Sequence, residues 1–344
     1  MVPYWRLSAY YFFYFAFIGA FSPYFTLYLQ SLAFSAWDIG VLMSLMQLMR
    51  LLAPNLWGWL ADRLGAKTPI VRGAALMSLA GFSCFFLAQS FAGFFLGMAL
   101  LAFFWSAALP LVEALTFTHL GAQANRYGAI RLWGSVGFIA AVLGLGWLLE
   151  RLPLAAILWV SVTILGGILA CAMALPEKRE DRHETDRQPI SDILRRREVK
   201  ALFAACFFMS AAHGALYVFY SIHLVSRGYG TTLVGFLWTL GVVAEIVVFL
   251  YLPRLFHRFS LRAILLFSFA CGVARFLMIG WGVEWLAVVV LAQLLHAATF
   301  GAYHASAVAA VNRWFAGRHQ ARGQALYGSL TFGAGGMLGG LLSG

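Results

Sequence analysis

Long apolar runs separated by short polar segments make up most of this chain. Eleven runs are long enough to cross a bilayer as a helix, for which about 18 consecutive apolar residues suffice. Lipid offers the backbone no hydrogen-bond partners, so runs of this length must be helices rather than single strands. The predicted spans are residues 7–29, 39–61, 69–89, 92–118, 129–149, 154–175, 200–223, 232–252, 262–282, 285–309 and 323–343. The pattern therefore predicts an all-α membrane protein.

The same helical unit occurs twice along the chain. Arg50 lies in the middle of one apolar run and Glu245 in the middle of another, 195 residues later. The same offset relates Gly19 to Gly214, Gly40 to Gly235, Leu60 to Leu255 and Arg63 to Arg258. A duplicated membrane unit with ionisable groups at corresponding depths is typical of secondary transporters.

One polar segment divides the runs into six and five. Residues 176–199 read PEKREDRHETDRQPISDILRRREV and are dense in both charges. We interpret this segment as a solvated cytoplasmic linker between bundles at residues 1–175 and 200–344, with a regulatory role left open. The repeat predicts a sixth span in the second bundle that the sequence lacks. Either the sequence is a fragment or the protein lacks its last helix.

Composition agrees with this class. The chain is 62% hydrophobic and 11% charged, whereas a soluble domain carries about 25% charged residues. The net charge of +11 is distributed over alternate loops, and only Arg151 and Arg227 fall in loops assigned to the outside. This positive-inside bias indicates a multi-pass protein of the bacterial inner membrane, not a nucleic-acid partner. We expect a monomer with a cytoplasmic N-terminus.

Enzyme chemistry has no support in the sequence. There is no nucleotide-binding loop, nucleophile elbow or metal-ligand spacing, and the four cysteines all fall within apolar spans. We therefore predict no catalytic residue, no metal and no cofactor.

The loop at residues 58–67 reads GWLADRLGAK and resembles the signature of the major facilitator superfamily. That resemblance implies two helical bundles that alternate access to a central site, with a gating motif made by Gly58, Asp62, Arg63, Gly65 and Lys67. Gly58 and Gly65 would permit a tight turn, and Asp62 could face the positive N-terminal end of a helix. A purely topological loop is the alternative. The second copy carries His257 in place of the aspartate.

A second stretch, VEALTFTHLGAQANRYGAIRLWGSVGFIA from Val112, resembles the lactose permease group of proton symporters, and particularly its phenylpropionate permease branch. In that group an acid and a base bind substrate and an aromatic ring stacks on it; Glu113, Arg131 and Phe138 occupy the matching positions. Arg131 could instead extend to the membrane surface. A carboxylate such as Glu113 is costly at a lipid face, which favours a functional role.

Three further ionisable groups lie deep in spans eight to ten. Arg275 and His296 match the proton pathway of the lactose permease group, but the group's acid after the histidine is Thr299 here. Glu245, three residues beyond the matching acid position, is the natural substitute. We expect burial to favour its protonated form and a nearby Arg275 its charged form. His296 could also be a structural core histidine, and Arg275 a structural partner of Glu245.

Together these features predict a secondary active transporter, a proton symporter for a small organic substrate. Arg50 and Arg275 would make the cavity positive, which suits an aromatic carboxylate such as phenylpropionate. A sugar or nucleoside symporter, or a transport-inactive truncated relative, is the alternative.

Overall fold

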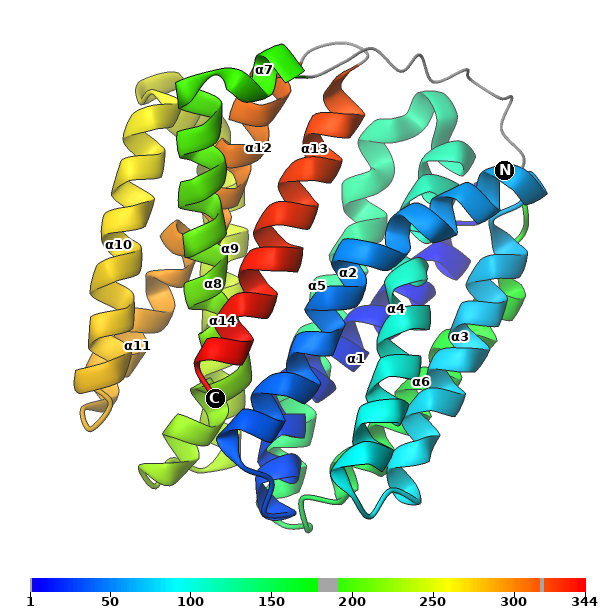
Figure 1. Cartoon of the computed structure of the whole chain (residues 1–344), viewed down its shortest axis with the longest axis vertical. Coiled ribbons are helices and arrows are strands. Elements are labelled where there is room, and N and C mark those ends of the chain that lie inside the picture. The colour runs from blue at the N-terminus through cyan, green and yellow to red at the C-terminus, as the bar shows by residue number, and fades with distance from the viewer. Residues whose placement is uncertain (1, 179–190, 316–318) are drawn as a thin grey trace.

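A computed structural model describes residues 2–178, 191–315 and 319–344, and these residues form helices joined by short turns (Figure 1). In the first half the helices are α1 Tyr4–Ser31, α2 Ala36–Leu64, α3 Thr68–Ser83 with η1 Cys84–Phe86, α4 Phe91–Leu120, η2 Gly121–Arg126, α5 Tyr127–Leu149 and α6 Ala156–Ala174. In the second half they are α7 Ser191–Arg195, α8 Arg197–Ser226, α9 Thr231–Arg258, α10 Leu261–Trp281, α11 Leu286–Leu294, η3 Ala297–Ala302, α12 Tyr303–Trp314, α13 Gln320–Gly328, η5 Ser329–Gly335 and α14 Gly336–Leu342.

The prediction of eleven spanning helices is confirmed. Within the described ranges, 11 helices are long and apolar enough to cross a membrane. The tenth combines α11, η3 and α12 into Leu286–Trp314, and the last combines α13, η5 and α14. Both η3 and η5 are π-helical turns, which occur frequently at functional sites.

Local sequence signals set the helix ends. Ser35 and Asp38 form a reciprocal capping box at the start of α2. Ser90 and Ser260 accept hydrogen bonds from the backbone at the starts of α4 and α10. Gly65 ends α2 at φ +61°, a left-handed conformation that glycine adopts without strain.

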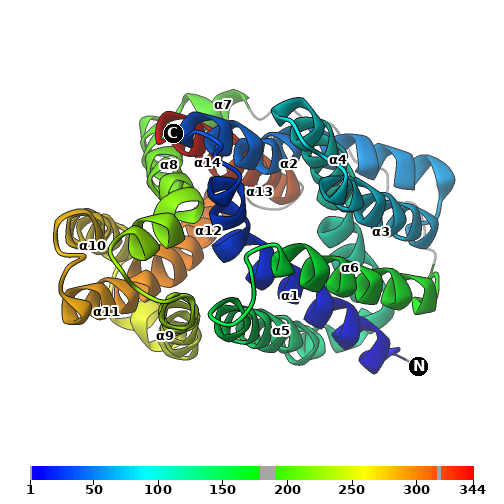
Figure 2. The same cartoon turned by 90° about the horizontal axis from the view of Figure 1, so that it is seen from below.

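The helices α1–α6 pack together on one side of the molecule and α8–α14 on the other (Figures 1 and 2). Glycines at repeat-related positions allow the closest approaches within each group. A Cβ atom at Gly19 of α1 would lie 2.5 Å from the carbonyl oxygen of Phe138 in α5. Gly214 of α8 packs equally closely on the carbonyl oxygen of Gly336 in α14. The internal repeat is therefore a repeat of helix packing, built on small residues.

Hydrogen bonds join the start of α3 to the end of α6 and to the residues that follow it. Arg72 donates hydrogen bonds to the carbonyl oxygens of Ala172, Met173 and Leu175, and the Glu177 carboxylate accepts one from the Thr68 backbone at 2.6 Å. These contacts satisfy the last carbonyls of α6 and the first amide of α3. Residues 179–190 of the predicted linker lie outside the described residues.

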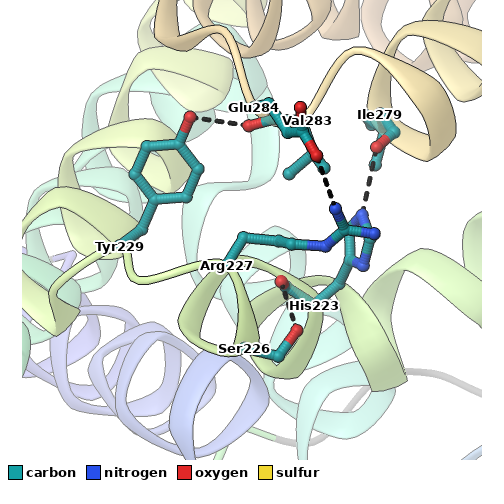
Figure 3. Close-up of polar contacts among 7 residues, drawn as sticks. All are labelled: His223, Ser226, Arg227, Tyr229, Ile279, Val283 and Glu284. Atoms are coloured by element: carbon teal, nitrogen blue, oxygen red, sulfur yellow. Dashed lines mark hydrogen bonds and ion pairs between the residues drawn. The ribbon is translucent and has the colours of Figure 1, made fainter.

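At the other end of the second group, the turn between α8 and α9 contacts the turn between α10 and α11. Arg227 pairs with Glu284 at 3.0 Å. Tyr229 and His223 contact the carbonyl oxygens of Val283 and Ile279 (Figure 3). Since the ion pair is exposed, it contributes about 1 kcal/mol or less, and its main effect is to fix the turns that precede α9 and α11.

Candidate functional site

Three predicted charges gather around Tyr14 on α1. Tyr14 is buried, stacks on Trp105 with ring centroids 4.3 Å apart, and interacts electrostatically with Arg50, Glu113 and Arg131. These residues come from α2, α4 and α5, so Tyr14 on α1 interacts with charges on three other helices.

Glu113 and Arg131 share a neighbourhood but have separate partners. Glu113 accepts a hydrogen bond from the Tyr127 hydroxyl at 3.1 Å. The Arg131 guanidinium lies 3.7 Å from the centre of the Phe15 ring and 6.0 Å from that of Tyr11, a cation–π arrangement. Among the described residues no ion pair joins the acid to the base, so the arginine's N–H groups are not committed to a carboxylate.

Arg50 is the most exposed of these groups. Its side chain makes one long hydrogen bond, 3.5 Å to Gln47 in its own helix. It interacts electrostatically both with Tyr14 on α1 and with Tyr217 on α8. Arg50 therefore interacts with both helix groups and has no carboxylate partner in the described part of the chain.

Phe138, expected to stack on substrate, is partly buried where α5 packs on α1, with its carbonyl oxygen against Gly19. The rings that contact Arg131 are Phe15 and Tyr11, and the stacking of Phe138 on a substrate stays a prediction.

Glu245 and His296 face each other inside the second group. The Glu245 Oε2 and His296 Nε2 atoms are 3.7 Å apart, and the two side chains are 17% and 10% exposed. The second ring nitrogen of His296 has no hydrogen-bond partner among the described residues. Gly301, in the π-helical turn after His296, leaves the room that Glu245 occupies, since a Cβ there would lie 3.2 Å from Glu245 Cγ. Glu245 also interacts electrostatically with Arg131 of the first group.

Arg275 is buried, with 1% exposure. Its guanidinium donates hydrogen bonds to four acceptors of the same group: Ala292 O at 3.0 Å, Thr299 Oγ1 at 3.0 Å, His213 Nε2 at 3.2 Å and Gln293 Oε1 at 3.3 Å. A guanidinium only donates, so His213 accepts through Nε2 and donates through Nδ1 to the Met209 carbonyl at 2.9 Å.

The expected pairing of Arg275 with Glu245 is wrong. Within the described ranges no ion pair joins them, because neutral acceptors from α8 and from the tenth span already surround the guanidinium. Arg275 holds α8, α10 and the tenth span together. By contrast, the guanidinium groups of Arg50 and Arg131 have no carboxylate partner among the described residues.

The loop at residues 58–67 agrees only partly with expectation. Gly65 makes the turn, as predicted. Gly58 does not, because it lies inside α2, where a Cβ would have no atom of the described residues outside its own helix backbone within 4 Å. Asp62 is exposed and makes no hydrogen bond or ion pair with the described residues, while Arg63 lies 5.4 Å from the Trp59 ring. Lys67 precedes α3 as its N-cap.

The two helix groups meet at the end opposite the linker, which the charge pattern assigns to the outside. There the Tyr24 hydroxyl of α1 donates to Thr231 O of α9 at 3.4 Å, and Thr231 Oγ1 donates to Gly146 O of α5 at 2.8 Å. The Glu150 carboxylate accepts from the Thr232 backbone at 3.1 Å, next to the positive end of α9. We call these contacts the outer latch.

Repeat-related glycines allow this closure. A Cβ at Gly40 of α2 would lie 2.8 Å from Gly340 O of α14, and one at Gly235 of α9 would lie 2.7 Å from Val142 O of α5. Figure 2 shows α2 beside α14 and α5 beside α9. Toward the linker end α2 and α13 diverge (Figure 1). The two helix groups are therefore closely packed at the end opposite the linker.

Comparison with known proteins places these features in context. The MFS_1 like family model matches residues 4–344. The "Probable 3-phenylpropionic acid transporter" of Escherichia coli (strain K12) is 31% identical over 335 residues, covering 94% of this chain and 86% of its own length. The maltose permease of Geobacillus stearothermophilus is 29% identical over 270 residues, covering 78% and 68%. The crystal structure of the nucleoside transporter NupG superposes with TM-score 0.81 at 18% identity, over 99% of this chain and 90% of that one.

Proposed function

We propose that this chain, which belongs to the MFS_1 like family of the major facilitator superfamily, is a proton symporter for a small aromatic carboxylate. As a member of this family it is a multi-pass transporter of the bacterial inner membrane. The observation that carries the finer proposal is the charge arrangement between the helix groups. Arg50 and Arg131 have no carboxylate partner among the described residues, and Arg131 interacts electrostatically with Glu245 of the pair Glu245–His296 in the other helix group.

Two open guanidinium groups favour an anionic substrate. The guanidinium N–H groups of Arg50 and Arg131 are not paired with a carboxylate of the described residues, so a substrate carboxylate would accept hydrogen bonds from them. Such charge-assisted hydrogen bonds are short and strong. The rings of Tyr14, Phe15 and Trp105 lie around the same charges and suit an aromatic body. The relative named for 3-phenylpropionic acid carries this combination of ring and carboxylate in its substrate.

Glu245 is the proposed proton carrier. Its side chain lies between Gly301 and the imidazole of His296. Burying an ionised carboxylate there without an ion-pair partner costs free energy. Protonation removes that cost and lets the helix groups reorient. As they close on the cytoplasmic side, we propose that Arg131, which already interacts with Glu245 across the space, controls when the proton can leave.

A second candidate is a neutral substrate. The maltose permease and the nucleoside transporter are relatives in sequence and fold, and Tyr217 and Gln47 would offer hydrogen bonds to hydroxyl groups. In that case Arg50 and Arg131 would donate to hydroxyls and bind them more weakly than a carboxylate.

The test is uptake into proteoliposomes under an imposed proton gradient. The compounds are 3-phenylpropionate, its neutral amide, maltose and uridine, with the internal pH recorded in parallel. We expect uptake of the acid, acidification of the lumen and no uptake of the amide. Arg131→Gln should weaken binding of the acid by a few kcal/mol, whereas Arg126→Gln, at an exposed arginine bonded to Gln123, should not. Equal uptake of the acid and its amide would exclude an anion site.

A further inference from the structure

The cytoplasmic end of α9 carries a basic hollow that transport does not explain. Pro253, Arg254, His257 and Arg258 line a surface depression of about 650 Å³. Arg254 lies three residues before His257 and four residues before Arg258, so each of these two side chains is its neighbour on the helix surface. Arg262 follows at the start of α10 and is also exposed.

Nothing in the described structure neutralises this hollow. Arg254 and Arg258 contact only the rings of Tyr251 and Phe259, at 5.5 and 5.8 Å, and no hydrogen bond or ion pair joins either arginine to a described residue. Glu245 is the one carboxylate between Thr231 and Trp281, nine residues before Arg254, which is about 13 Å along a helix. By contrast, Arg72 at the same membrane face donates to three carbonyl oxygens.

The surface next to the hollow is apolar and faces outward. Leu250, Tyr251 and Phe259 are 72%, 56% and 48% exposed, on helices that span the membrane. Such side chains are expected to contact acyl chains. The hollow therefore combines a cationic pocket at headgroup level with an apolar wall below it, which fits an amphipathic anion better than a soluble one.

We propose that this hollow binds the headgroup of an anionic phospholipid, with its phosphodiester between Arg254 and Arg258 and its acyl chains along Leu250 and Tyr251. His257 adds a ring N–H donor, at the position where the first copy of the repeat carries Asp62. An acid there would repel the phosphate, so the loss of the acid in the second copy is what makes the hollow anion-binding. This site is distinct from the transport site and does not depend on the proposed substrate.

The proposal is tested by native mass spectrometry of the full chain released from nanodiscs that contain phosphatidylglycerol and phosphatidylcholine. The test variant is Arg254→Gln/Arg258→Gln. The matched control is Arg195→Gln/Arg197→Gln, which removes the same charge from the same membrane face. Thermal unfolding of each variant confirms that it is folded.

We expect the test variant to lose roughly 25-fold in affinity for phosphatidylglycerol, at about fivefold per basic residue. Its affinity for phosphatidylcholine and both affinities of the control should stay as in the unmodified protein. An equal loss in the control would overturn the proposal, because the binding would then follow total charge. Complete displacement of the lipid by inorganic phosphate would also overturn it, in favour of a soluble-anion site.

Discussion

Gly235→Ala should open the outer end of the protein. A methyl group at Gly235 would lie 2.6 Å from Tyr24 Oη and 2.7 Å from Val142 O, whereas ordinary van der Waals contact begins at 3.4 Å. These two atoms are themselves hydrogen-bonded at 2.7 Å, so α5 and α9 must separate to admit the methyl. Overpacking of this kind costs about 1–3 kcal/mol. The cost applies only to the conformation closed outside, so the equilibrium should move toward the outward-open state by roughly 5- to 150-fold.

The measurement is the distance between spin labels at Leu152 and Trp285, two exposed residues in outer turns of opposite helix groups, in a cysteine-free background. Gly235→Ala should add a population at longer distance. Gly144→Ala is the matched control, because a Cβ at this α5 position would meet no atom of a neighbouring described element within 4 Å. A Gly235→Ala distribution identical to that of the unmodified protein would refute the reasoning, as would an equal shift in the control.

Three further substitutions test other parts of the structure. Arg275→Gln leaves four buried acceptors without their donor, which costs about 1–3 kcal/mol for each group left unsatisfied. This substitution should therefore lower the melting temperature strongly, whereas Arg254→Gln, at an exposed arginine, should not. Equal melting temperatures of the two variants would show that the hydrogen-bond network of Arg275 is dispensable. Asp62→Asn should slow transport at normal membrane abundance if Asp62 caps a helix in the opposite conformation, and unchanged uptake rates would leave it a topological role only. Arg50→Gln should weaken binding of an aromatic acid by a few kcal/mol but not of its amide, as measured by calorimetry; equal losses for both would argue against a carboxylate contact.

The spans could be predicted because lipid imposes one solution on long apolar runs. The repeat was equally visible, and its glycines proved informative. Gly19 and Gly214 are packed within the groups, while Gly40 and Gly235 are packed between them. Sequence alone could not separate these roles, since both require only the absence of a side chain.

Side-chain partners could be predicted less well. The pattern placed Glu245, Arg275 and His296 at similar depths, but depth does not give rotation about the helix axis. The π-helical turn Ala297–Ala302 changes that rotation within the tenth span, where Thr299 faces Arg275 and Gly301 faces Glu245. Polar residues on predicted spans, such as Gln293 and His213, were the available signal for the Arg275 network. Nothing in the sequence indicated that Glu150 contributes to the outer latch, because exposed acidic residues in turns are common.

Proton coupling through Glu245 is tested most directly by comparing two activities of Glu245→Gln in the same vesicles. One is counterflow, which needs only reorientation of the loaded carrier. The other is uphill uptake, which needs the proton to leave. Because glutamine resembles the protonated acid, we predict that counterflow persists and accumulation is lost, while Glu284→Gln, at an exposed acid of the same helix group, retains both. Accumulation by Glu245→Gln at the level of the unmodified protein would contradict the account and move the proton site away from Glu245.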